Sequence, residues 1–441
     1  MARYILINDK LNNFDKKITV SSDKSISIRT ILLASQAIGV TKITNLLESE
    51  DVLNTLKTIK KLGINFKKIG KTYKIFGYGL NGFNLKSNIT LDAGNSGTLA
   101  RLILGLLVKS KYKVKLIGDN SLSKRDFSRV IKPLKLFGVN INSKKNILPI
   151  EILGTDYLRP IIYDENIGSA QVKSCLILAA INTPGTTVIN SKISRNHTEL
   201  MLKSLKYPIK VEKKKNLEII SIKGLFQFEA FNYNVPGDIS SAAFYIVLTL
   251  LGKKSKITIE NVNINKSRLG VITILNKMGA GIKLKNKRIY NGEEISNLYV
   301  SSKKNLKPIN CPPKLNSSAI DEFLIIFLVA ARAKGISRFK DLGEMNKKES
   351  KRLNLGINFL KLIGIKVERI GNNINIYGNP NLELSDTFEI KNFLKDHRIF
   401  FLSCIAALTL GGKWKINDKT SANTSFPKFI EILKNVGAKI N

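Results

Sequence analysis

"LKTIKKLGINFKK", residues 56–68, joins an amphipathic helical pattern to a short β-like run through Gly63. Glycine at this point is typical of a helix C-terminus, because it readily takes the left-handed conformation that ends a helix. Four more stretches have this form, residues 131–142, 272–285, 359–370 and 429–441. In a sixth copy, residues 200–212, Tyr207-Pro208 stands where the others have glycine. The copies recur roughly every 70–85 residues, which is a long period for a solenoid repeat.

A second pattern alternates with the first and consists of a strongly apolar helix, a polar turn and a strand. Its six copies are residues 32–46, 102–118, 175–191, 244–262, 323–342 and 401–418. Each unit therefore has one helix that we expect to be buried and one that we expect to be half exposed. Six such units in 441 residues predict an α/β architecture with three units in each of two domains. One large doubly wound sheet is the alternative, and the regular pairing of the two helix types argues against it.

The charge of the chain is strongly positive, with 72 Lys+Arg against 33 Asp+Glu and a net charge of +39. Such a charge makes nucleic acid a possible partner. The lysines are spread over the polar faces of the predicted elements, and no RNP-type aromatic strand, zinc finger or arginine-rich arm is present. We therefore expect no nucleic-acid partner, although the positive field would attract small anionic substrates.

The sequence predicts a cytoplasmic protein without a metal. The first residues contain no apolar signal-peptide region, and the apolar runs, such as residues 323–331, are about half the length that spans a bilayer. Cys175, Cys311 and Cys404 are far apart and show no metal or redox spacing. His197 and His397, the only histidines, are also too far apart in sequence to suggest a metal site.

Polar side chains precede all six apolar helices, in residues 23–29, 91–101, 168–174, 235–243, 317–323 and 394–400. Ser, Asp and Asn are ordinary helix caps. Capping does not explain the cationic and amide side chains that recur there, namely Lys24, Arg29, Arg101, Gln171, His397 and Arg398. If the units are arranged alike, these helix starts converge on a cleft that suits a substrate with several phosphates or carboxylates.

Two loops add further cations. Residues 118–129 contain Lys124, Arg125 and Arg129, and residues 344–352 contain Lys347, Lys348, Lys351 and Arg352. Glu349 lies among the second group, where a carboxylate is either structural or a proton shuttle, and its spacing alone favours the structural role. Asp321 fits a helix cap, and its neighbours also allow a general base.

Together these motifs resemble the 5-enolpyruvylshikimate-3-phosphate synthase family, the 3-phosphoshikimate 1-carboxyvinyltransferases. The matching stretches are "DKSISIR", "GNSGTLAR", "GDNSLSKR", "SAQVKS", "SRNHTE", "VPGDISSAA", "KKESKR", "DHRI" and "SFPKF", in the family's order and over essentially the whole chain. The resemblance implies the enolpyruvyl transferase fold, an inside-out α/β barrel of two domains with three βαβαββ units each. Residues 1–22 with 237–441 would form one domain and residues 23–236 the other, with the active site in the cleft between them.

The resemblance also implies the reaction. The enolpyruvyl group of phosphoenolpyruvate moves to the 5-hydroxyl of shikimate 3-phosphate through a tetrahedral intermediate, and phosphate is released. This is a step of the shikimate pathway, toward chorismate and the aromatic amino acids, and no metal or other cofactor is implied. We also expect the protein to be a cytoplasmic monomer. The rival family is UDP-N-acetylglucosamine enolpyruvyl transferase, whose active-site loop usually has a cysteine in the region matching residues 118–125, where this chain has none. A third alternative is an inactive relative, which the joint presence of Lys24, Arg125, Asp321, Glu349 and Arg398 argues against.

Residue roles follow from the resemblance. The implied shikimate 3-phosphate contacts are Lys24, Ser25, Arg29, Ser169, Gln171, Ser194, Arg195, Asp321 and Lys348. The implied phosphoenolpyruvate contacts are Lys24, Asn95, Gly97, Arg125, Gln171, Arg352 and Arg398. Asp321 would be the base for the 5-hydroxyl and Glu349 the proton shuttle at the methylene carbon. Lys24 and, in a secondary role, His397 would complete the catalytic set.

Some positions depart from the family pattern. Ser21-Ser22 replaces Pro-Gly, Asp126 replaces a common Pro, Asn346 and Lys351 replace Arg and Asp, and Thr424 stands where some members have a lysine. The branch without that lysine includes members that tolerate the inhibitor glyphosate, often with Ala where this chain has Gly97. The glycine therefore predicts that glyphosate inhibits this protein.

Overall fold

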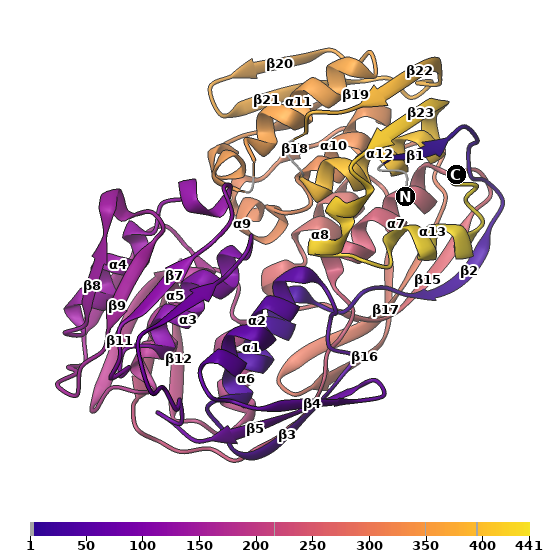
Figure 1. The fold of residues 1–441 in the computed structure, drawn as a ribbon. Coiled ribbons are helices and arrows are strands. Elements are labelled where there is room, and N and C mark those ends of the chain that lie inside the picture. The colour runs from indigo at the N-terminus through magenta and orange to yellow at the C-terminus, as the bar shows by residue number, and fades with distance from the viewer. Residues whose placement is uncertain (1–3, 216, 349, 394–395) are drawn as a thin grey trace. The chain divides into compact units, whose positions relative to one another are not determined.

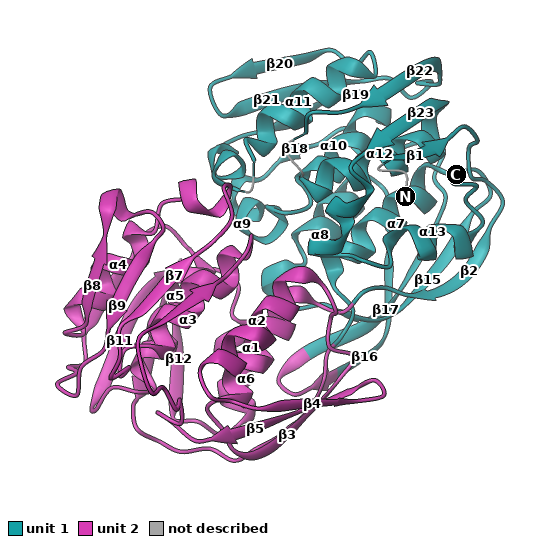
Figure 2. Ribbon diagram, in the orientation of Figure 1, with its two compact units in different colours: residues 1–21, 236–288, 294–441 teal, residues 22–235, 289–293 magenta. Residues whose placement is uncertain are grey.

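A computed structural model describes residues 4–215, 217–348, 350–393 and 396–441. The chain forms two compact units, shown in Figure 2. Unit 1 comprises residues 1–21, 236–288 and 294–441, and unit 2 comprises residues 22–235 and 289–293. The short segment 289–293, which the sequence analysis placed with residues 237–441, belongs to unit 2.

Unit 2 contains three four-stranded sheets among its described residues. Their strand orders are β14-β3-β5-β4, β6-β7-β9-β8 and β10-β11-β13-β12. The first sheet has β3 (Ile38–Thr44), β4 (Phe66–Ile69), β5 (Thr72–Tyr78) and β14 (Asn232–Asn234). The second has β6 (Ile89–Asp92), β7 (Val114–Ile117), β8 (Asn140–Ser143) and β9 (Ile150–Leu153). The third has β10 (Ile162–Glu165), β11 (Thr186–Lys192), β12 (Ile209–Lys214) and β13 (Leu217–Lys223).

The described strands of unit 1 form sheets β16-β17-β15-β2, β18-β19-β21-β20 and β1-β23-β22. The first has β2 (Asp15–Thr19), β15 (Lys256–Asn263), β16 (Lys283–Tyr290) and β17 (Glu293–Ser301). The second has β18 (Asn310–Cys311), β19 (Gly335–Phe339), β20 (Val367–Ile370) and β21 (Asn373–Gly378). The third has β1 (Tyr4–Ile7), β22 (Leu384–Ile390) and β23 (Gly411–Asn417). The N-terminal strands β1 and β2 thus pair with β23 and β15, which lie far along the chain.

Six apolar helices lie inside the two units, with the sheets around them (Figure 1). Unit 2 contains α1 (Lys24–Ala34), α3 (Gly97–Leu106) and α5 (Ala170–Ala180), and unit 1 contains α7 (Ile239–Leu251), α10 (Phe323–Arg332) and α12 (His397–Leu410). All 13 residues of α7 are buried. Each buried Leu or Ile side chain contributes about 1.5–3 kcal/mol of transfer free energy. The predicted buried helices are confirmed, and each begins within or just after its predicted polar stretch.

The amphipathic helices cover the other positions of the repeat. They are α2 (Glu50–Lys61), α4 (Ser128–Leu136), α6 (His197–Ser204), α8 (Gly270–Lys277), α11 (Arg352–Leu362) and α13 (Phe429–Val436), and the short α9 (Asn316–Ala319) precedes α10. Sheets such as β6-β7-β9-β8, with helices α3 and α4 between successive strands, give the βαβαββ unit. The predicted α/β fold of six such units is confirmed. None of the helices among the described residues is long and apolar enough to cross a membrane.

The glycines after the amphipathic helices have the left-handed backbone that the repeat predicted. Gly63, for example, has φ 88° and Gly437 has φ 118°. In the sixth copy the equivalent residue is Lys206, with φ 57°, immediately before Tyr207-Pro208. Our expectation that Tyr-Pro replaces the glycine was therefore wrong by one residue. The left-handed turn is needed to reverse the chain, and here a lysine adopts it.

Replacing Lys206 by glycine should stabilise the protein. The side chain is exposed, and a left-handed conformation costs a non-glycine residue about 1 kcal/mol or somewhat more. We expect Lys206→Gly to raise the urea midpoint, measured by circular dichroism. Lys203→Gly, inside α6, is the control and should lower the midpoint, because glycine destabilises a helix interior by about 1 kcal/mol. A lower midpoint for Lys206→Gly would contradict this explanation.

Candidate active site

The start of α1 in unit 2 contains a paired lysine. Asp23 caps the helix, its Oδ1 accepting a hydrogen bond from the Ile26 backbone N–H at 2.9 Å. Lys24 is the first helical residue, and its Nζ lies 2.8 Å from Oδ2 of Asp51 in α2. A cation at a helix N-terminus costs about 0.3–1 kcal/mol, which the ion pair with Asp51 offsets. The Lys24 side chain remains 20% exposed.

Arg29, one turn further into α1, is buried and held by three elements. Its Nε donates to Thr198 Oγ1 at 2.9 Å, its Nη1 to the Ser25 carbonyl at 3.0 Å and its Nη2 to Ser174 Oγ at 2.9 Å. Burial lowers the pKa of Arg29 to about 10, and nearby carboxylates, Glu199 foremost, oppose this shift. The guanidinium is therefore still a cation at neutral pH, and it is fixed in place.

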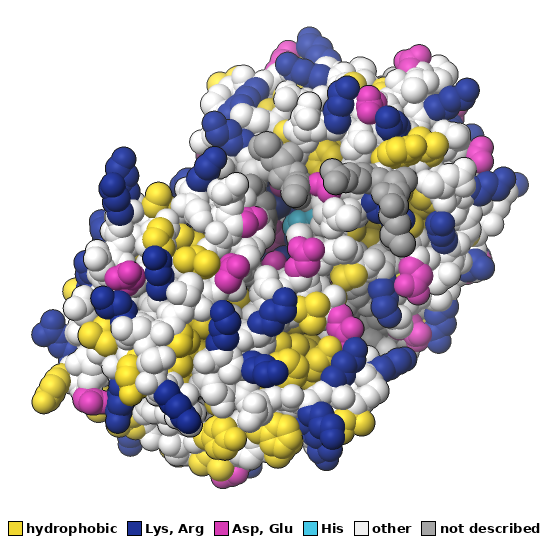
Figure 3. Space-filling model, viewed as in Figure 1, with side chains coloured by type: hydrophobic (Ala, Val, Ile, Leu, Met, Phe, Trp, Pro, Cys, Tyr) yellow, Lys and Arg dark blue, Asp and Glu magenta, His cyan; other side chains and the backbone are white. Residues whose placement is uncertain are grey.

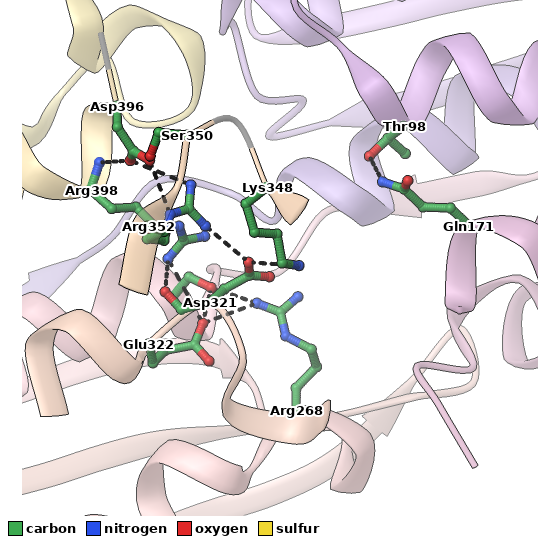
Figure 4. A network of polar contacts seen from close by, with 11 residues as sticks. Thr98, Gln171, Arg268, Asp321, Glu322, Lys348, Ser350, Arg352, Asp396 and Arg398 are labelled. Carbon is green, nitrogen blue, oxygen red and sulfur yellow. Dashed lines mark hydrogen bonds and ion pairs between the residues drawn. The ribbon is translucent and has the colours of Figure 1, made fainter. Parts of the chain in front are cut away.

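The start of α5 contributes an amide and a hydroxyl. Gln171 donates through Nε2 to Thr98 Oγ1 at 3.0 Å (Figure 4), and its Oε1 accepts from Arg101 Nη1 at 3.1 Å. Ser169 caps α5 by accepting from the Val172 backbone N–H. These bonds join the starts of α3 and α5, as the sequence predicted for equivalent helices.

Arg125 lies beside the start of α3, and the first residue of this helix is Gly97, which has no side chain. Its Nη2 donates to Asn95 Oδ1 at 3.1 Å. A Cβ added to Gly97 would lie 2.9 Å from Arg101 Nη1 and 3.0 Å from Arg125 Nη1. The glycine therefore leaves space for two guanidinium groups at a helix N-terminus, where an anion is favoured.

Ser194 and Arg195 precede α6. Ser194 Oγ is buried and has no hydrogen-bond partner among the described residues. A buried hydroxyl without a partner costs free energy, and a ligand oxygen would satisfy it. Arg195 is partly exposed, and its positive field lowers the pKa of Arg29, after the larger effect of burial.

In unit 1, Asp321 is held by cations, as Figure 4 shows. Its Oδ1 lies 3.3 Å from Lys348 Nζ and 3.5 Å from Arg352 Nη1. Its backbone carbonyl accepts from Arg398 Nη1 at 2.6 Å. The helix α10 begins after Glu322, which makes no side-chain cap bond. Asp321 therefore lies one residue before the cap position of α10, with two cations on its carboxylate.

Asp396 fixes the two arginines of unit 1. It caps α12 by accepting from the Arg398 backbone N–H at 3.0 Å. Its carboxylate also binds Arg352, with Nε to Oδ2 at 3.1 Å and Nη2 to Oδ1 at 3.3 Å, and accepts from Ser350 Oγ at 2.7 Å. The side chains of Arg352 and Asp396 are 1% and 0% exposed. Asp396 therefore fixes the guanidinium group of Arg352 and, through the same carboxylate, the start of α12.

A second buried carboxylate supports the same helix starts. Glu322 Oε1 accepts a hydrogen bond from Ser240 Oγ and lies 3.8 Å from Arg268 Nη2 and 4.0 Å from Arg398 Nη1. Arg268, the last residue of the turn η3 (Lys266–Arg268), also binds Asp238 Oδ1 at 3.2 Å. The network joins the starts of α7, α10 and α12, and Figure 4 shows the contacts of Glu322 with Arg268 and Arg398.

His397, the first residue of α12, is buried, and its Nδ1 lies 3.2 Å from Thr424 Oγ1. Its ring packs edge-on against Phe401. Thr424, which stands where some members of the family named above have a lysine, therefore contacts His397. Glu349, the predicted proton shuttle, lies outside the described residues.

The predicted site residues thus fall into two groups, one on each unit, and the structure adds partners that the sequence analysis missed. Asp51 gave no signal, because an acid in the first turn of an amphipathic helix is ordinary. Arg268 belongs to none of the sequence motifs described above, and only the structure shows that it is buried beside Asp238 and Glu322. Among the described residues, no group of His, Cys, Asp and Glu is arranged to hold a metal ion. Lys and Arg side chains are distributed over the visible face of each unit (Figure 3).

Comparisons with known proteins identify the class and then the family. The fold is that of an enolpyruvyl transferase, since it matches NikO from Streptomyces tendae with a TM-score of 0.76 over 100% of this chain and 99% of that one, at 14% identity. It matches EPSP synthase from Acinetobacter baumannii with a TM-score of 0.87 and 35% identity, over 99% of both chains. The 3-phosphoshikimate 1-carboxyvinyltransferase of Ruthia magnifica is 42% identical over 98% of this chain and 97% of that protein.

The family model for EPSP synthase (3-phosphoshikimate 1-carboxyvinyltransferase) matches residues 9–433. The chain belongs to this family, and the enzyme class predicted from the sequence is confirmed. The family's reaction transfers the enolpyruvyl group of phosphoenolpyruvate to shikimate 3-phosphate, in the shikimate pathway.

Replacing Asp396 by asparagine should weaken phosphoenolpyruvate binding selectively. Asparagine can still cap α12, but Arg352 loses its two-point contact with a charged carboxylate and keeps the longer contact with Asp321. We expect the KM for phosphoenolpyruvate to rise about tenfold or more, and stability to fall by up to about 3–5 kcal/mol, as for a broken buried pair. Steady-state kinetics and urea unfolding measure both. Glu389→Gln, in an exposed ion pair with Lys415, is the control and should change neither. An unchanged KM in Asp396→Asn would contradict the assigned role of Asp396.

Proposed function

We propose that this chain transfers the enolpyruvyl group of phosphoenolpyruvate to the 5-hydroxyl of shikimate 3-phosphate through the groups described above. The observation that carries the assignment is the Asp321 carboxylate, held by Lys348 and Arg352. A carboxylate in a fixed position can take the proton of a substrate hydroxyl as that oxygen attacks carbon. Lys348, on the same carboxylate oxygen, would also hold the hydroxyl oxygen of the substrate.

Phosphoenolpyruvate would bind to Arg125, Arg352 and Arg398. Guanidinium groups match carboxylate and phosphate oxygens in two-point contacts. Arg352 and Arg398 are already held by Asp396, Asp321 and Glu322, so little reorganisation accompanies the reaction. Fixed charges of this kind stabilise charge that develops in a transition state.

The 3-phosphate of the other substrate would bind in unit 2. Ser194 supports this assignment because its buried hydroxyl lacks a partner, and Ser169, Gln171 and Arg195 would supply further donors. Lys24 would contact both substrates. Arg29 donates to three protein oxygens, so we assign it chiefly the role of fixing Ser25 and adding positive charge behind the site.

Protonation of the methylene carbon requires an acid, and elimination then requires a base there. We assign this to Glu349 on the resemblance of its motif, with His397 and Thr424 as a supporting pair. We further propose a cytoplasmic monomer that binds neither nucleic acid nor membrane. The three free, buried cysteines are consistent with a reducing compartment, and the Lys and Arg side chains on the face shown in Figure 3 are scattered.

The proposal is tested by measuring phosphate release from phosphoenolpyruvate with shikimate 3-phosphate, against each substrate alone. Release that requires both substrates, with the enolpyruvyl product identified by NMR, supports it. A folded protein that releases phosphate only when UDP-N-acetylglucosamine replaces shikimate 3-phosphate would contradict it.

Replacing Asp321 by asparagine should reduce kcat. The amide keeps the shape of the carboxylate but cannot accept the proton, and loss of a general base costs about 10²–10⁴-fold. Stopped assays of product formation measure the effect. The control is Glu344→Gln on the neighbouring loop, where Glu344 pairs with the exposed Lys347, and it should retain the wild-type kcat. Wild-type turnover in Asp321→Asn would assign the base elsewhere.

Replacing Gly97 by alanine should weaken the binding of phosphoenolpyruvate and the binding of glyphosate together. The new methyl group would lie within 3.0 Å of Arg101 Nη1 and Arg125 Nη1, so both guanidinium groups must shift. We expect glyphosate to inhibit the wild type. In the variant, we expect the KM for phosphoenolpyruvate and the inhibition constant of glyphosate each to rise about tenfold. The KM for shikimate 3-phosphate should not change. A wild type that is fully active in millimolar glyphosate at low phosphoenolpyruvate would overturn the inhibition prediction.

A further inference from the structure

A hairpin of unit 1 ends in a tip that belongs to unit 2. Strands β16 and β17 are joined at Asn291 and Gly292, whose φ angles are 47° and 80°. Two successive left-handed residues are typical of a tight hairpin turn. Residues 289–293 cluster with unit 2, as Figure 2 shows by their colour. The chain therefore leaves unit 1 and returns to it within five residues.

The tip is fixed to unit 2 by close contacts. Asn291 Nδ2 donates to the Asn232 carbonyl at 3.0 Å, and the ring of Tyr290 meets that of Tyr233 at a 69° angle. A Cβ on Gly292 would lie 2.6 Å from the Leu200 carbonyl in α6. Only glycine permits this approach, so the tip is placed against α6 with little freedom.

Glu293, at the end of the tip, forms a buried pair with a histidine. Its Oε1 lies 2.6 Å from His197 Nδ1, and the two side chains are 1% and 0% exposed. The other ring nitrogen of His197, Nε2, is buried without a hydrogen-bond partner among the described residues. Glu293 therefore fixes the orientation of the imidazole.

His197 is the first residue of α6, which follows directly from the segment containing Ser194 and Arg195. Thr198, the next residue, accepts from Arg29 and donates to Ser174. The start of α6 therefore contacts Glu293 through His197 and Arg29 through Thr198. The field of Glu293 also favours the charged form of Arg29.

We propose that Glu293 is a positioning residue for the shikimate 3-phosphate pocket, acting through His197 on Ser194, Arg195 and Thr198. The inference rests on the proposed function, because it takes these residues as phosphate contacts or their supports. The segment 289–293, which interrupts unit 1, would then contribute to the binding of shikimate 3-phosphate. The proposal predicts a change in the affinity for shikimate 3-phosphate but not in the affinity for phosphoenolpyruvate.

The test measures the Kd for shikimate 3-phosphate by calorimetry without phosphoenolpyruvate, and both KM values with kcat, for the wild type, Glu293→Ala and Glu293→Gln. We expect Glu293→Ala to raise the Kd and KM for shikimate 3-phosphate about tenfold or more, with an unchanged KM for phosphoenolpyruvate. Glu293→Gln can still accept from Nδ1–H, and it should recover most of the affinity. Ile150→Ala, in the buried part of β9, is the matched control, because it should lower stability and leave both KM values unchanged.

The outcomes separate the two proposals. If the wild type neither binds shikimate 3-phosphate nor releases phosphate, the proposed function fails and the role of Glu293 fails with it. If the wild type is active and Glu293→Ala binds shikimate 3-phosphate normally, or if both KM values rise alike, only the positioning role is overturned. Selective loss that glutamine restores supports it.

Discussion

Buried cations at the helix starts are the constraint on which the site depends. Arg29, Arg268 and Arg352 are at most 4% exposed, and an uncompensated charge at such depth costs several kcal/mol. The N-terminal end of a helix adds to the penalty. Asp396 and Glu322 therefore pair with the arginines of unit 1, and three protein oxygens accept from Arg29 in unit 2. The positions of these charges are set by the fold before any substrate arrives.

The six apolar helices make this arrangement possible. Each is almost wholly buried, and its charged side chains lie in its first two turns, apart from Arg332 at the end of α10. A βαβαββ repeat places equivalent helix starts in equivalent positions, and the residues that differ between copies give each start its chemistry. Gly97 in unit 2 makes room for arginines, whereas Asp396 in unit 1 holds one. The same local structure thus supplies the proposed anion site and the carboxylates that hold its arginines.

Much of the fold follows from the sequence, because helix periodicity, glycine stops and polar helix starts are local signals. The repeat predicted the buried helices and the left-handed turns, apart from the placement of the turn at Lys206. Long-range pairing was not predictable, since Asp51 and Arg268 look ordinary until the fold brings Lys24 and Glu322 beside them. The assignment of residues 289–293 to unit 2 also escaped notice, because a hairpin tip shows no sign of what it packs against. Spacing left the role of Asp321 open and favoured a structural role for Glu349, and the resemblance named the chemical role of each.

The measurement that tests the account most directly is a crystal structure of Asp321→Asn with shikimate 3-phosphate and phosphoenolpyruvate bound. The account predicts the 3-phosphate within hydrogen-bond distance of Ser194 Oγ and Ser169, and the anionic groups of phosphoenolpyruvate on Arg125, Arg352 and Arg398. It also predicts the side chain of residue 321 beside the 5-hydroxyl. A 3-phosphate bound to Arg352 and Arg398, or a 5-hydroxyl remote from residue 321, would contradict the division of charges on which the mechanism rests.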